Sequence, residues 1–128
     1  MSFRLDTAHE VPPNGLDIAI LRKAKALLAD ADDWDRQDDR LCTPDKPGLS
    51  LHCALRKATI SESGGFHHRR SAMQIVRKLV DVRSAGRDCK HRLRDYDNDP
   101  RTTPADLQSL FDEAILKAQA GQAADTAR

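Results

Sequence analysis

The sequence predicts an all-α protein: one compact domain of about five helices around a short central helix, with a long loop between the first two helices. Three observations predict this class. Apolar residues recur at helical spacing in several stretches. Only five of the 128 residues are aromatic, whereas β-sheets are usually rich in aromatic and β-branched side chains. Proline and glycine interrupt the chain between the periodic stretches. A chain of this length can bury a core without metal or disulfides.

The domain is expected to span residues 14–120. Before it, residues 1–13 lack helical periodicity and end in two prolines, which predicts a flexible arm. After it, residues 121–128 form a tail of mostly small residues that we also expect to be flexible.

The first helix is predicted over 16–31, where apolar residues share one stripe. Asn14 and Asp17 are equally suitable as its N-cap. The stripe consists of Leu16, Ile20, Ala24, Leu27, Leu28 and Ala31.

Residues 34–48 are polar and are interrupted by Pro44, Pro47 and Gly48, which predicts a long loop. Trp34 and Leu41 are its only bulky apolar residues, so we expect them to hold it against the domain.

The central helix is predicted over 49–60, with Ser50 at the N-cap position. Leu51, Ala54, Leu55 and Ala58 fall on one side of it, and Leu49, Cys53 and Ile60 on the other. A helix with two opposed apolar sides should be covered on both.

Residues 71–82 carry the clearest amphipathic pattern. Its apolar face holds Ala72, Ile75, Val76, Leu79, Val80 and Val82. A short helix follows, with a stripe at Cys89, Leu93 and Tyr96, and residues 95–102 are predicted to form a turn.

Thr103 and Pro104 suit the N-cap and first positions of the last helix, which should end near Ala120. Its apolar stripe consists of Leu107, Leu110, Phe111, Ala114, Ile115 and Ala118.

The net charge of +1 conceals an uneven distribution. Residues 56–94 hold eleven Lys or Arg and three Asp or Glu, a balance of +8, which leaves −7 elsewhere. No apolar stretch approaches the roughly 20 residues that cross a bilayer, so we expect no membrane partner. Three cysteines leave one unpaired, which favours a reducing cytoplasm.

Three catalytic or metal-site interpretations have simpler alternatives. A zinc site is not favoured, because the ligand pairs lack the usual spacing; its candidates are His52, Cys53, His67, His68, Cys89 and His91. Core cysteines and solvated histidines explain these residues, since Cys53 and Cys89 are in phase with apolar neighbours. Cys89, flanked by Arg87, Lys90 and His91, also suits a nucleophile, but no catalytic signature accompanies it.

A calcium loop over residues 95–106 is the third of these interpretations. Asp95, Asp97, Asp99 and Asp106 match its ligand positions, but Pro100 stands where the loop needs glycine. A capped turn explains the same aspartates, because Asx side chains bond to nearby backbone in turns.

A basic face is the strongest candidate contact surface. Its residues are Arg69, Arg70, Arg77, Lys78, Arg83, Arg87, Lys90, Arg92 and Arg94. The alternative is a solvated face that the acidic residues 30–45 partly neutralise. We predict a small cytosolic interaction or accessory module without a catalytic centre, cofactor or metal, whose partner is a protein. Nucleic-acid binding through the same face is the second hypothesis, and a zinc- or thiol-dependent enzyme is the third. The oligomeric state stays open.

Three short motifs resemble a small uncharacterised bacterial and phage family of unknown function. They are Trp34 with Gln37, the run 53–55 followed by Ala58, and the turn that begins at Tyr96 and leads into the last helix. The family pattern is Trp-x-Gln, Cys-Ala-Leu-Gly-Ala, and Trp-Asn-Asp-x-Pro-Gly-Arg-Thr. This chain has one extra residue in the first motif, Arg56 in place of glycine, and a reversed Asx pair in the third. The resemblance covers roughly 16–117 and implies a compact domain, with no catalytic residues to transfer.

Overall fold

Residues 12–36, 41–43, 48–67, 69–85 and 91–126 are described by a computed structural model. These residues form five α-helices and one 3-10 turn: α2 (Gly15–Leu27), η1 (Ala31–Asp33), α3 (Leu51–Ser63), α4 (Ser71–Arg83), α5 (Arg92–Asn98) and α6 (Pro104–Thr126). The described residues hold no strand, only one isolated parallel bridge between Trp34 and Leu49. The all-α prediction is confirmed.

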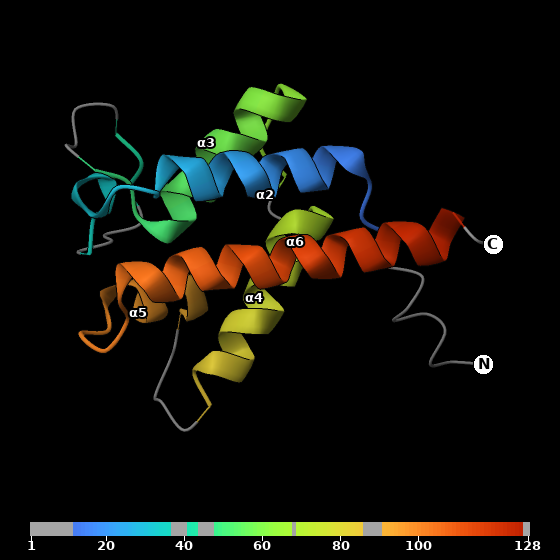
Figure 1. Ribbon diagram of the computed structural model, residues 1–128. Helices are drawn as coiled ribbons and strands as arrows, with labels where there is room; N and C mark the ends of the chain where they lie inside the picture. Colours follow the sequence, from blue (N-terminus) through green and yellow to red (C-terminus); the bar gives the residue numbers. More distant parts are fainter. Residues whose placement is uncertain (1–11, 37–40, 44–47, 68, 86–90, 127–128) are drawn as a thin grey trace.

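Helices α2 and α6 lie side by side and run in opposite directions (Figure 1). The start of α2 therefore lies next to the end of α6, where Pro13 meets Gly121 and Gly15 meets Gln122. In this view α3 packs on α2 above the pair, and α4 packs on α6 below it. The short α5 contacts both α3 and α4, so it joins the two sides of the molecule.

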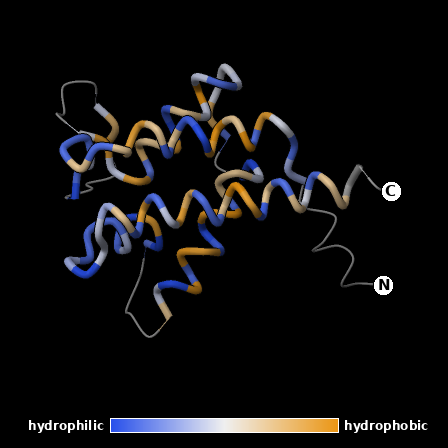
Figure 2. Tube along the Cα trace, in the orientation of Figure 1, coloured by the Kyte–Doolittle hydropathy of each residue, from blue (hydrophilic) through white to orange (hydrophobic). Residues whose placement is uncertain are grey.

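The core is aliphatic and lies between these helices. Apolar and hydrophilic positions alternate along α2, α4 and α6 (Figure 2), as amphipathic helices around a shared core require. The largest fully buried side chains are Phe111, Ile20, Leu21, Leu28, Leu51, Leu55, Met73, Leu107, Leu110, Val76, Val80 and Thr59. Nearly all predicted stripe positions of α2, α4 and α6 therefore face this core.

Side-chain caps determine where α2 starts and where it stops. Asn14 is the N-cap, and it forms a capping box with Asp17. The Asn14 side chain accepts from the Asp17 backbone N–H, and the Asp17 carboxylate accepts from the Asn14 backbone N–H. Asn14 and Asp17, the two residues considered for the N-cap, therefore both take part in the cap. The helix ends at Leu27, four residues before the predicted end, because Asp30 caps the next turn by accepting from Asp32 N–H. Ala31, predicted to lie in the buried stripe, is therefore exposed.

The last helix begins as predicted, since Thr103 Oγ1 accepts from Asp106 N–H and the Asp106 carboxylate accepts from Thr103 N–H. It runs to Thr126, well past the predicted end at Ala120. Its final turns lie against the start of α2, and this packing is a tertiary effect that local sequence does not encode. The turn predicted at 95–102 is also partly helical, because α5 extends to Asn98.

The two-sided burial of the central helix holds only at its N-terminal end. Leu51, Ala54, Leu55 and Ala58 are fully buried and Cys53 is 4% exposed, but Ile60 is 39% exposed. On that second side the segment 41–43 covers Cys53 through a disulfide with Cys42, whereas Ile60 borders an open cleft between α2 and α3. Two other predicted contacts are wrong: Leu41 is 59% exposed and Val82 is 74% exposed.

Candidate functional site

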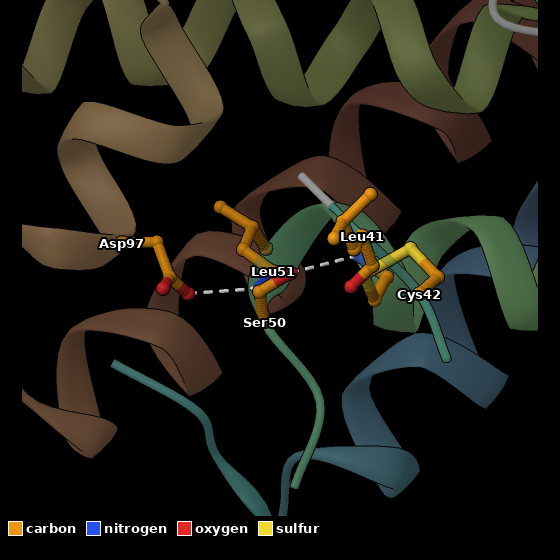
Figure 3. Close-up of a disulfide and its surroundings, with 6 residues drawn as sticks. Leu41, Cys42, Ser50, Leu51 and Asp97 are labelled. Carbon is orange, nitrogen blue, oxygen red and sulfur yellow. Dashed lines mark hydrogen bonds between the residues drawn. A yellow bond between two sulfur atoms is a disulfide. The ribbon is translucent and has the colours of Figure 1, made fainter. Parts of the chain in front are cut away.

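The Asp97 carboxylate is a fully buried acceptor at the point where α3, α5 and the loop meet. Its Oδ1 accepts from Trp34 Nε1 (2.6 Å) and from the Leu51 N–H (2.8 Å). Figure 3 shows Asp97 bonded to Leu51 at the start of α3, with the disulfide on the other side of that helix end. The three motifs that resemble a known family therefore come together here: Trp34, the start of α3, and the end of α5.

Backbone contacts fix the loop next to this carboxylate. Leu49 N–H donates to Asp33 O (2.8 Å), and Asp35 N–H donates to Leu49 O (2.9 Å). The Arg36 guanidinium lies 4.8 Å from the centre of the Trp34 ring. It also donates to three carbonyls, of Asp99, Pro100 and Thr102, over 2.8 to 3.2 Å. The Asp97 region is thus a structural junction, and all of its described donors are backbone or structural side chains.

Beside this junction, Cys42 and Cys53 form a disulfide across eleven positions of sequence. Cys53 is buried as predicted, but it is not a free thiol. The disulfide lines an open cleft of about 570 Å³ between α2 and α3. Leu27, Leu49 and Ile60 give the cleft an apolar wall, and Arg56, Lys57 and Asp33 bring charge to it.

Among the described residues, the predicted basic face is partly neutralised by carboxylates on the helices. Four of its nine residues form ion pairs: Arg70 with Asp17, Arg83 with Glu113, Arg92 with Asp81, and Arg94 with Asp95. Arg87 and Lys90 lie outside the described residues. The acidic partners in these four pairs come from α2, α4, α5 and α6.

Like charges nevertheless gather where α4 faces the start of α5. Burial lowers the pKa of the Arg77 guanidinium, and the neighbouring charges of Arg92 and Arg69 lower it further. Burial also acts to lower the pKa of Arg83, but hydrogen bonds with Glu113 and Tyr96 outweigh it and raise that pKa overall. We call Arg69, Arg77, Lys78 and Arg92 the α4 cluster.

The predicted metal candidates are engaged elsewhere. Cys53 is bonded to Cys42, and the His52 ring meets the Phe66 ring edge-on at 5.9 Å. Among the described residues, no group of three or more His, Cys, Asp or Glu could hold a metal ion. His68 and Cys89, with the nucleophile hypothesis based on Cys89, lie outside the described residues.

The four aspartates of the calcium interpretation have structural partners. Asp97 holds Trp34 and Leu51, Asp106 caps α6, and Asp95 accepts from His91 N–H. Asp99 pairs with Arg101 over 2.8 Å. Local capping therefore accounts for Asp95, Asp99 and Asp106, whereas Asp97 binds donors far away in the sequence.

Sequence reasoning missed the two most informative features. The sequence predicts Asp97 as a calcium ligand or as part of a capped turn, not as a buried acceptor, and it does not pair Cys42 with Cys53. The order Trp34, Cys53, Asp97 within the family-like motifs was the one available signal for the junction. No local pattern indicates which two of three cysteines meet.

A comparison with protein families identifies the class. Residues 12–117 match the family of unknown function DUF6197, and the chain belongs to this family. No curated protein and no solved structure matches it significantly. Within the described part of the chain, no helix combines the length and the apolar composition needed to cross a bilayer.

Proposed function

We propose that this protein is a small helical interaction module whose α4 cluster binds an acidic segment of a partner protein. The observation that carries the proposal is the gathering of cations around α4, where Arg69 and Arg92 lie close enough to the half-buried Arg77 to add to the lowering of its pKa by burial. Clustered cations attract an anionic segment and favour its binding through complementary charge.

The surroundings of the cluster favour a protein partner over nucleic acid. Asp81 is exposed on the same helix and pairs with Arg92, so the face carries both signs of charge. Val82 is 74% exposed, and it lies one turn from Lys78. Mixed charge around an exposed apolar side chain is typical of protein interfaces, whereas phosphate binding favours clustered cations alone.

The test is binding to an acidic peptide. Fluorescence anisotropy with labelled polyglutamate should show binding that weakens at least about fivefold in Arg69→Glu/Lys78→Glu, because each reversal turns an attraction into a repulsion. Arg22→Glu/Lys23→Glu on α2 changes two equally exposed cations by the same charge and serves as the matched control. Equal weakening in both double variants, or no binding at low salt, would contradict the proposal.

Nucleic acid is the alternative outcome of the same experiment. Tighter binding of duplex DNA than of polyglutamate would favour phosphate recognition through this face. In that case the logarithm of the binding constant should fall steeply and linearly with the logarithm of the salt concentration. Loss of that binding in Arg77→Glu/Lys78→Glu would assign it to the α4 cluster.

A further inference from the structure

We propose that the Cys42–Cys53 disulfide is a thiol–disulfide exchange site that reacts with small anionic thiols in the cleft between α2 and α3. The two cysteines and two cations, Arg56 and Lys57, line the same cleft. The inference is independent of the α4 cluster and of its partner.

Two cations lie on the same side of α3 as Cys53 and line the same cleft. Arg56 and Lys57 follow Cys53 by three and four positions on α3, which places all three on one side of the helix. Cys53 also lies in the first turn of α3, where Ser50 is the N-cap and accepts from the Cys53 N–H. Helix N-termini and neighbouring cations both stabilise a thiolate, so Cys53 is a good leaving group when the disulfide opens.

Burial decides which sulfur is attacked. Cys53 is 4% exposed, whereas Cys42 is half-buried and lies in a segment that covers α3 from outside. An incoming thiolate therefore attacks Cys42 Sγ, the bond to Cys53 breaks, and Cys53 leaves as a thiolate. A second thiolate attacks the outer sulfur of the mixed disulfide and releases Cys42, which takes up a proton. Two external thiols are oxidised to one disulfide, and the protein disulfide is reduced by two electrons.

The cleft indicates the kind of thiol. Its volume of about 570 Å³ lies within the range of small-molecule sites. Among the described residues that line the cleft, two are cationic, Arg56 and Lys57, and one is anionic, Asp33. Leu27, Leu49 and Ile60 offer apolar contact beside these charges. A small thiol with an anionic group and a short apolar stem fits both properties.

Three thiols of similar size separate charge from general reactivity: 2-mercaptoethanesulfonate, 2-mercaptoethanol and cysteamine. In full-length protein carrying Cys89→Ser, the rate of disulfide loss is followed by alkylation and mass spectrometry and divided by the thiolate concentration. We expect the anionic thiol to react roughly fivefold faster than the neutral one, and the cationic thiol to be slowest. The advantage should vanish in Arg56→Gln/Lys57→Gln and persist in Arg22→Gln/Lys23→Gln.

Equal normalised rates for the three thiols would overturn the proposal, as would an anionic advantage that survives Arg56→Gln/Lys57→Gln. A second measurement does not depend on those variants folding normally. In Cys42→Ser/Cys89→Ser, the thiolate absorbance of Cys53 should titrate below the ordinary cysteine range. Titration at or above about 8.5 would also overturn the proposal.

Discussion

The indole Nε1 of Trp34 donates to Asp97 Oδ1 over 2.6 Å, and this bond joins positions 63 residues apart in sequence. The same oxygen accepts the Leu51 N–H at the start of α3. One buried carboxylate oxygen thus fixes the loop, α3 and α5 relative to one another.

Replacing Asp97 should strongly destabilise the fold. Asp97→Ala leaves the Trp34 and Leu51 donors buried without this acceptor, and we expect a loss of about 3 kcal/mol or more in urea unfolding followed by circular dichroism. Asp97→Asn keeps an acceptor oxygen and should lose less. The control is Asp112→Ala, which removes only a surface ion pair with Lys25 and should cost about 0.5 kcal/mol. Equal stability of Asp97→Ala and the control would refute the junction.

Replacing Asp17 should destabilise the protein more than replacing Asn14, the N-cap residue of the same capping box. It is 2% exposed and accepts from Ala72 N–H (3.1 Å) as well as from Asn14, and it pairs with Arg70. Asp17→Ala therefore removes the link between α2 and α4, with an expected loss of about 3 kcal/mol. Asn14→Ala removes only the side-chain cap and should cost about 1 kcal/mol. Denaturant midpoints that rank the two variants in the opposite order would contradict this assignment.

Gly48 should resist substitution because backbone lies directly beside it. A Cβ at this position would be 3.0 Å from Asp33 O and 3.2 Å from Asp35 N, both of which take part in the bridge around Leu49. We expect Gly48→Ala to cost about 1 to 2 kcal/mol in thermal unfolding, since backbone cannot move aside as a side chain can. At Gly65 the nearest atom would be 3.9 Å away, so Gly65→Ala should be nearly neutral. Similar melting curves for the two variants would count against a close approach at Gly48.

Reduction should weaken the protein by a measurable amount. The disulfide closes a loop of eleven positions, and loops of that order stabilise a fold by about 3 kcal/mol through the unfolded state. Urea unfolding of Cys89→Ser protein with and without dithiothreitol measures the difference. Cys42→Ser/Cys53→Ser should match the reduced protein and be unaffected by the reductant. If dithiothreitol leaves the urea midpoint unchanged, the disulfide does not contribute to the free energy of unfolding.

Helical periodicity was enough to predict the fold class and most of the buried positions. The stripes of α4 and α6 are clear because each helix has one core-facing side, and the caps at Ser50 and Thr103 follow from local chemistry alone. Predictions became wrong where burial depends on a distant element. Ile60 and Val82 have the spacing of core residues but are 39% and 74% exposed, because an apolar period does not state what stands opposite.

The site was harder to predict because its parts are non-local. Asp97 is unremarkable among the aspartates of its turn, and its role depends on two donors from positions 34 and 51. The disulfide likewise depends on how segment 41–43 crosses α3. Charge blocks were a poor guide, since Arg70 and Arg83 found carboxylates on α2 and α6 rather than in the acidic loop.

The carboxylate that binds the start of α3 comes from the last third of the chain. Neither half of the polypeptide therefore contains both the donors and the acceptor of this junction. A cut between α4 and α5 would leave one fragment with an indole and an amide lacking their acceptor, and the other with a carboxylate lacking its donors. Mixing such fragments should restore helical content that neither has alone, which makes this a natural place to divide the protein for complementation.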